Sequence, residues 1–141
     1  MKLKVLRFTK FTTCNLDLKY FSLSEFDSPD KIGSGKLMDY TFLEKLDYAR
    51  GNAEIPFKIN SGYRTKSRNL LVGGRVGSSH LKGLACDIMC IGSRDRFIII
   101  NSLLEVGINR IGIAKTFIHC DVDKSKDPDV IWMYWFNKFE Y

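Results

Sequence analysis

The side chains of this 141-residue chain that could do chemistry gather in two short segments. The chain has two histidines: His80 stands seven residues before Asp87, and His119 stands two residues before Asp121. Imidazole nitrogen and carboxylate oxygen are the ligands of a catalytic zinc, which takes three protein ligands and keeps one position open for water. Two histidines and one aspartate would meet that requirement. The alternative is two unrelated histidines, each hydrogen-bonded in a turn or a sheet.

Both segments alternate as β-strands do, and the alternation separates polar side chains from apolar ones. In a strand over 84–91, Asp87 would face away from its cysteine and isoleucine neighbours. In a strand over 117–122, His119 and Asp121 would share one face. We therefore expect the thiols and aliphatic side chains in the core, and the polar groups together on the other side.

The elements around these segments predict an α+β fold, with helices packed on a mostly antiparallel central sheet and the zinc site on that sheet. The expected elements are an irregular or short-strand cap over 1–25, helices over 37–50 and 93–105, strands over 56–60, 84–91, 110–113, 117–122 and 130–136, and a glycine-rich loop over 72–83. Gly51 and Asn52 are expected to end the first helix, and Ser93 to cap the second. The aromatic tail over 132–136 is expected to pack as a core strand, and the alternative is an aromatic surface that faces the substrate.

Composition indicates a single domain over 1–141 and excludes two classes of protein. Ten Phe, six Tyr and two Trp are too many aromatics for a disordered chain. The longest apolar run, 97–100, is far shorter than the roughly 20 residues of a membrane span. The N-terminus is basic without an apolar stretch behind it, so we expect no signal peptide and synthesis in the cytoplasm. A net charge of +6 favours polyanionic partners without selecting one.

Three other patterns in the sequence resemble functional motifs but lack the context that such motifs require. Gly33-Ser-Gly-Lys36 lacks the first Gly, the final Ser or Thr and the preceding strand of a phosphate-binding loop. A four-cysteine zinc site would need Cys14 and Cys120 far from the pair Cys86 and Cys90, so buried, reduced thiols are expected instead. The basic excess comes without a recognisable nucleic-acid-binding module, and we expect no nucleic-acid partner.

A series of short motifs runs through residues 24–122. They are Ser24-Glu-Phe26, Ser61-Gly-Tyr-Arg-Thr65, Asn69, Val72-Gly-Gly74, Ser78-x-His-x-x-Gly-x-Ala-x-Asp87 and His119-x-Asp121. In this order they resemble the zinc D-Ala-D-Ala carboxypeptidases and L-alanyl-D-glutamate endopeptidases, a group of cell-wall peptidases that includes phage endolysins and whose metal-site fold is shared with hedgehog domains. The resemblance implies Zn²⁺ held by His80, Asp87 and His119.

The resemblance also implies roles for three further residues. Arg64 would be an active-site arginine, and a guanidinium suits a substrate carboxylate or the oxyanion of a tetrahedral intermediate. Ser78 resembles a hydroxyl that contacts substrate. Several relatives carry an acid three residues before the last zinc histidine, where this chain has Thr116. We therefore expect Asp121 to act as general base or to orient the zinc water, with a carboxylate that holds His119 as the alternative role.

These residues predict a zinc metallopeptidase that hydrolyses peptidoglycan stem peptides, between D-alanines or between L-Ala and D-Glu. The alternatives are a catalytically inactive zinc-containing binding module of the same fold and a small basic nucleic-acid-binding domain. A cell-wall enzyme made in the cytoplasm without a signal fits a phage or prophage lytic protein, which a membrane-perforating partner releases. We expect a monomer.

Overall fold

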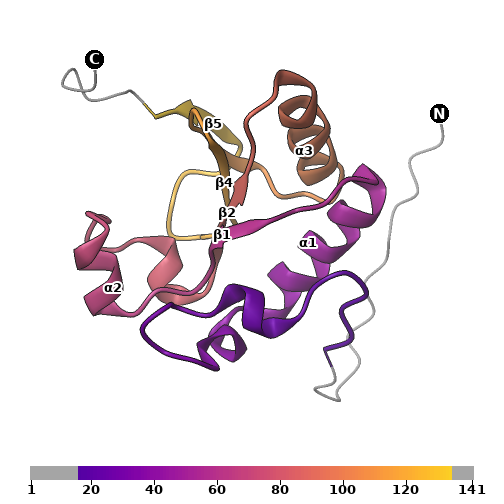
Figure 1. The fold of residues 1–141 in the computed structure, drawn as a ribbon. Coiled ribbons are helices and arrows are strands. Elements are labelled where there is room, and N and C mark those ends of the chain that lie inside the picture. Colours follow the sequence, from indigo (N-terminus) through magenta and orange to yellow (C-terminus); the bar gives the residue numbers. More distant parts are fainter. Residues whose placement is uncertain (1–15, 135–141) are drawn as a thin grey trace.

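A five-stranded sheet forms the centre of the computed structural model, which describes residues 16–134 (Figure 1). Its strands are β1 (Ile59–Ser61), β2 (Ala85–Met89), β3 (Arg110–Ile113), β4 (Phe117–Asp121) and β5 (Val130–Met133), in the order β1-β2-β4-β3-β5. All neighbouring strands are antiparallel except β3 and β5, which are parallel. The predicted α+β fold with a mostly antiparallel sheet is confirmed.

The α-helices form two groups around the sheet. Helices α1 (Tyr40–Ala53) and α3 (Ser93–Glu105) lie side by side and contact each other on one side of the sheet, whereas the short α2 (Lys66–Leu71) stands away from them (Figure 1). Three 3-10 helices complete the described chain: η1 (Leu23–Phe26), η2 (Ser34–Leu37) and η3 (Ser79–Lys82). Helix η3 leads into β2, and therefore carries the first histidine to the sheet.

The hydrophobic core fills the space between helices α1 and α3 and one face of β2 and β4. Phe42, Leu46 and Leu103 from the helices meet Ile88 and Ile118 from the strands, and all five are fully buried. Burying each such side chain contributes about 1.5–3 kcal/mol to stability. The core also holds Cys86, Cys90 and Cys120, which are free thiols as expected, while Cys14 lies outside the described residues.

Two helix predictions need adjustment. Helix α1 begins at Tyr40 rather than 37, because the side chain of Asp39 accepts a hydrogen bond from the backbone N–H of Phe42 at 2.8 Å. The expected stop at Gly51 and Asn52 is wrong, because both lie inside this helix, which ends at Ala53 and is followed by Glu54 as C-cap with φ 55°. Helix α3 has its predicted bounds, but the residue at its N-cap is Gly92.

Helix α2 was not predicted, and its surface explains why. Leu70 and Leu71 are 82% and 77% exposed, so the segment has no apolar stripe that faces the core. Thr65 is the one local signal: its hydroxyl accepts a hydrogen bond from the backbone N–H of Arg68 at 3.0 Å and caps the helix.

The prediction that the aromatic tail packs as a core strand is wrong for its described part. Within residues 16–134, strand β5 pairs only with β3, at the edge of the sheet, and Ile131 and Met133 are 55% and 61% exposed. Trp132, between them, turns to the opposite face and lies 5.5 Å from the ring of His119. An edge strand that lies beyond the covering helices has no core side to fill. Residues 135–136 lie outside the described residues.

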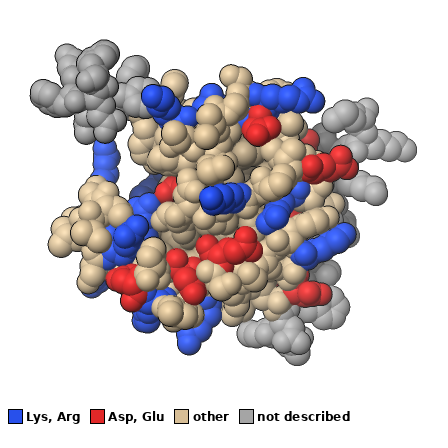
Figure 2. Space-filling model, viewed as in Figure 1, with Lys and Arg blue, Asp and Glu red and all other residues tan. Residues whose placement is uncertain are grey.

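The surface carries mixed charge. Figure 2 shows Lys and Arg side chains spread among Asp and Glu over the visible face, with basic atoms bordering the lobe where α2 lies in Figure 1. Among residues 16–134, no helix combines the length and the apolar composition that crossing a bilayer requires.

Candidate metal centre

One row of residues crosses the sheet on the face opposite the core. The strand register places Ser61 of β1 beside Asp87, Asp87 beside His119, His119 beside Gly112, and Gly112 beside Trp132. Directly paired residues of neighbouring strands project their side chains from the same face. The absence of a side chain at Gly112 is required here, because a Cβ would come within 2.7 Å of the Trp132 ring. The row therefore brings the predicted carboxylate and the second histidine together.

The first histidine reaches this row from η3. Ser78 caps that helix, since its hydroxyl accepts a hydrogen bond from the backbone N–H of His80 at 3.4 Å. Gly83 ends it with φ 69°, and a Cβ there would lie 2.3 Å from the carbonyl oxygen of Leu37. These two caps fix where the helix starts and stops, and the ring of His80 comes to 5.2 Å from the ring of His119.

His80, Asp87 and His119 form a buried cluster with metal-ligand geometry. Nε2 of His80 and Nδ1 of His119 lie 3.3 Å and 2.9 Å from Oδ1 of Asp87, and all three donor atoms are within 4.8 Å of one another. Ligand atoms around a tetrahedral zinc are about 3.3 Å apart, given metal–ligand distances of about 2.0–2.1 Å. The three residues therefore have the donor atoms and the spacing that could hold a metal ion.

Acceptors behind the two rings fix which nitrogen faces the cluster. The carbonyl oxygen of Gly62 can only accept, so Nδ1 of His80, 2.7 Å away, carries a proton. Nε2 of His119 likewise donates to Oδ2 of Asp121 at 3.0 Å. Nε2 of His80 and Nδ1 of His119 are then left to face Asp87. Hydrogen bonds of this kind set the tautomer and orientation of metal-binding histidines.

Without a metal ion, the side chains of Asp87 and His119 interact strongly with their neighbours, and their pKa values are shifted. Burial would raise the pKa of Asp87, but hydrogen bonds from His119 and His80 outweigh it and hold the pKa well below its usual range. Burial would lower the pKa of His119, but hydrogen bonds to Asp121 and Asp87 raise it to about 9. A metal at Nδ1 of His119 would replace the proton there, so its binding releases that proton.

Arg64 lies at the cluster, where the sequence predicted it. Its Nη2 donates to Oδ2 of Asp87 at 2.9 Å, and its Nε donates to the hydroxyl of Ser61 at 2.8 Å. The arginine holds Asp87 from the side opposite the histidines. Its Nη1 donates to Oδ1 of Asn69 at 3.5 Å, and the guanidinium keeps further N–H groups that can meet a substrate.

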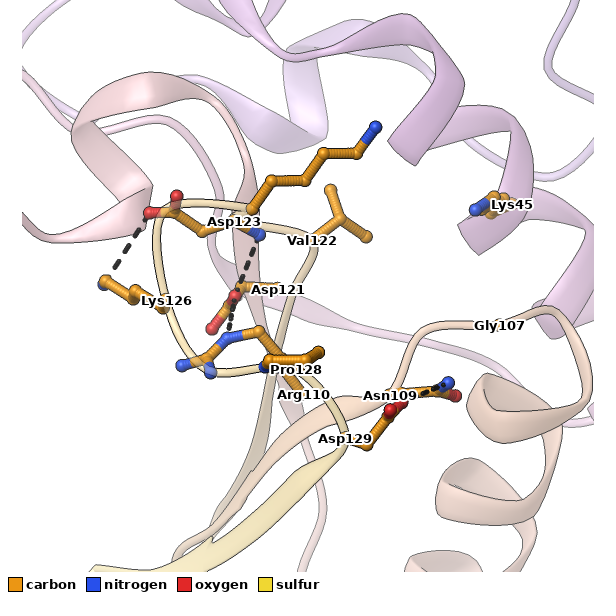
Figure 3. A pocket seen from close by; sticks show the side chains of 11 residues that line it. Lys45, Gly107, Asn109, Arg110, Asp121, Val122, Asp123, Lys126, Pro128 and Asp129 are labelled. Atoms are coloured by element: carbon orange, nitrogen blue, oxygen red, sulfur yellow. Dashed lines mark hydrogen bonds and ion pairs between the residues drawn. The ribbon is translucent and has the colours of Figure 1, made fainter.

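Asp121 is held on both of its oxygens. Oδ2 accepts from His119, and Oδ1 accepts from Nε of Arg110 at 2.7 Å and from the backbone N–H of Asp123 at 3.1 Å. Figure 3 shows Arg110 reaching Asp121 at the wall of a cavity of about 320 Å³ that also contacts Lys126. Burial would raise the pKa of Asp121, but the hydrogen bond from His119 and those from the Asp123 backbone and Arg110 lower it. This geometry favours the role of holding His119.

The structure adds two aromatic residues that the sequence prediction missed. Trp132 and Tyr134 lie on the site face beside His119, with ring centroids 5.5 Å and 6.5 Å from its ring. Burial raises the pKa of the Tyr134 phenol, and the charge of Asp87 adds to this, so the hydroxyl keeps its proton and can donate it in a hydrogen bond. The alternation of strand β5 could have placed both rings on one face, but nothing local indicates which face.

A second missed feature is the carboxylate of Asp123, which ties η3 to the loop after β4. It is buried, and its oxygens accept from Ser79, Lys82 and Ser125 at 2.8, 3.0 and 2.6 Å. Because Ser79 precedes the first histidine of the cluster, this network fixes the helix that carries the histidine. The signal in the sequence is weak, since Asp123 stands in a run of charged residues typical of a solvated loop.

Comparison with known families agrees with this geometry. The profile of the family described as Peptidase M15 matches residues 19–121, which contain all three residues of the cluster. No curated protein matches the chain.

Proposed function

The chain belongs to the M15 peptidase family, and from this premise we propose that it is a zinc-dependent peptidase that hydrolyses peptide bonds in the stem peptides of peptidoglycan. The observation that carries the proposal is the buried His80–Asp87–His119 cluster on a sheet face lined by Arg64 and Tyr134. The scissile bond is a D-Ala–D-Ala or an L-Ala–D-Glu bond. The biological role that fits such a substrate is that of a phage or prophage lytic enzyme.

The three residues of the cluster would hold the metal through Nε2 of His80, a carboxylate oxygen of Asp87 and Nδ1 of His119. A zinc ion in such a site supplies a water molecule of lowered pKa and polarises the carbonyl of the scissile bond. The Gly62 carbonyl and the Asp121 carboxylate keep the two rings in the orientation that this requires.

Two residues are placed to act on the peptide itself. Arg64 keeps unused N–H donors beside Asp87, and Tyr134 keeps its phenolic proton. Both can donate to the oxygen that gains negative charge when the peptide carbonyl is attacked. Ser78 contacts substrate in this scheme through the face of its hydroxyl that does not cap η3. Asp121 acts as a positioning residue, because each of its oxygens already accepts a hydrogen bond within the protein.

One observation favours a second candidate, a zinc-containing binding module without activity. Both oxygens of Asp121 accept hydrogen bonds, so β4 carries no unpaired carboxylate that could accept a proton from water. In addition, Thr116 stands at the position where several of the cell-wall peptidases that the chain resembles carry an acid. Such a module would hold zinc and bind stem peptides without cleaving them.

Digestion of purified peptidoglycan separates these candidates. The zinc-loaded protein is expected to release new amino and carboxyl ends, which mass spectrometry assigns to one bond. Chelation should abolish the release and added zinc should restore it, while His119→Ala should give none in either state. Bound zinc without any new ends would establish the binding module, and release that persists after chelation would exclude a metallopeptidase.

A further inference from the structure

A hollow of about 210 Å³ opens beside the metal cluster, between β1 and α2. Asp87 and Arg64 line the hollow together with Phe117 at the start of β4 and with Arg68 and Val72 of the α2 segment. A molecule that fills the hollow therefore touches the carboxylate of the cluster. The hollow is therefore placed to hold the substrate residue that lies next to the scissile bond.

The two guanidinium groups that line this hollow differ in their partners. Arg64 donates to Ser61 and Asp87, and the charge of Asp87 balances its own. Arg68 is half-buried, and among residues 16–134 its guanidinium makes no hydrogen bond or ion pair. A guanidinium carries five N–H donors and no acceptor, so a half-buried one without a partner is suited to binding an anion.

The carboxylate of Asp30 interacts electrostatically with Arg68, but it already accepts hydrogen bonds from other side chains. Hydrogen bonds from the hydroxyls of Ser28 and Thr65 lower the pKa of Asp30, and the charge of Arg68 adds a smaller effect. Asp30 is solvent-exposed, so water screens its interaction with Arg68. The planar fork of Arg68 is left for another carboxylate.

The backbone that carries Arg68 is fixed in place. Its N–H is bound by the Thr65 cap, and the buried side chain of Asn69 donates to the carbonyl of Arg75 at 3.0 Å. Gly74 packs so closely on Asn69 that a Cβ would lie 2.0 Å from its side-chain oxygen. The loop after α2 is thereby folded back on the helix. Little ordering of the backbone remains to be done when a ligand binds.

From this arrangement we infer that the hollow is a subsite for a carboxylate-bearing residue of the substrate, which Arg68 binds and Val72 contacts. The inference rests on the proposed peptidase function and deepens it. Arginine binds carboxylates through two parallel N–H···O hydrogen bonds, which a lysine cannot reproduce. In a stem peptide the carboxylate comes either from the chain end or from an acidic residue within the peptide, and both present the same chemistry.

Three synthetic stem pentapeptides distinguish these sources when they are given to the zinc-loaded full chain. One keeps all carboxylates, one has an amidated C-terminus, and one has the free carboxylate of its D-Glu residue amidated. Arg68→Ala is expected to raise KM about tenfold or more on the unmodified peptide with little change in kcat. The KM of Arg68→Lys should lie between those of the wild type and Arg68→Ala. Lys66→Ala, which removes an exposed charge from the same helix, should have the KM of the wild type.

Amidation of the recognised carboxylate should cost the wild type as much as Arg68→Ala does, and the two losses should not add. The peptide on which Arg68 no longer matters identifies the source. An unchanged KM in Arg68→Ala, or the same loss on all three peptides, would overturn the subsite. If the wild type cleaves none of them, the proposed function fails, and calorimetric titration with the same peptides still tests for a carboxylate-dependent, Arg68-dependent affinity.

Discussion

Nε2 of His119 donates a hydrogen bond to Oδ2 of Asp121 at 3.0 Å, and the two residues stand on the same face of β4. Arg110, paired with Asp121 across β3 and β4, holds the second oxygen of that carboxylate at 2.7 Å. The histidine ring cannot turn without breaking this chain of contacts. Its Nδ1 is therefore directed at Asp87 before any metal arrives, which lowers the cost of assembling the site.

Replacing Asp121 should weaken metal binding more than it changes the fold. We expect Asp121→Ala to lower zinc affinity about 10- to 100-fold, because His119 loses the partner that sets its tautomer. Competition with a chromophoric chelator measures the affinity. Asp127→Asn, which alters an exposed carboxylate in the next loop, is the matched control. Equal zinc affinity in Asp121→Ala and Asp127→Asn would contradict the positioning role.

Arg64→Lys tests whether the shape of the guanidinium matters or only its charge. A lysine cannot bridge the Ser61 hydroxyl and the Asp87 carboxylate while it presents further donors to the peptide. We expect kcat/KM to fall about 10- to 100-fold, with one zinc still bound per chain. Wild-type activity in this variant would show that a single positive charge is sufficient.

Tyr134→Phe removes one proton donor from the site face and keeps the ring. If the phenol meets the developing oxyanion, kcat should fall about tenfold or more while zinc affinity stays the same. Because the pKa of Tyr134 is raised, the wild type should keep this contribution at least to pH 10. Steady-state kinetics of both proteins across pH measure it, and Met133→Leu, at an exposed neighbouring position, serves as control.

Asp123 should make the protein sensitive to acid. Burial would raise the pKa of Asp123, but hydrogen bonds from Ser125, Ser79 and Lys82 bring it well below its ordinary value of 3.8. The unfolded carboxylate therefore takes up a proton before the folded one. Its stabilisation is complete above about pH 4 and is lost as the pH falls towards the folded pKa.

Chemical denaturation at several pH values compares Asp123→Asn with the wild type. We expect the variant to be less stable by about 2 kcal/mol at neutral pH and to depend less on pH below 4. Parallel stability curves for the two proteins between pH 2 and 5 would rule out this role of Asp123.

Gly62→Ala should disturb both the fold and the metal site. A Cβ at Gly62 would lie 2.7 Å from Cα of Phe26, and the shift that relieves this moves the carbonyl that accepts from His80. We expect a loss of about 2 kcal/mol in stability and a weaker affinity for zinc. Gly92→Ala, which has no atom within 4 Å of the added Cβ, should change neither. Thermal unfolding and zinc titration of both variants give the comparison.

The alternation of the strand sequences was enough to separate the two faces of the sheet. Because side chains alternate strictly along a strand, Cys86 and Cys120 went to the core and Asp87 and His119 to the other face, as the structure confirms. Helix α3 was equally predictable, since its apolar spacing is a local signal, and it has the expected bounds 93–105. The fold class follows from such local patterns, whereas the set of His80, Asp87 and His119 was predicted from the resemblance to the cell-wall peptidases.

Tertiary structure alone decided what surrounds the cluster. Strand register is a long-range property, so only the fold could place Arg110 beside Asp121 and Trp132 beside the row through His119. The same holds for Arg68 and Asp87, which line one hollow although they are distant in the chain. Local pattern reports which way a side chain points relative to its own strand or helix. Which partner it meets depends on how distant segments pack, and the sequence of one segment does not contain that information.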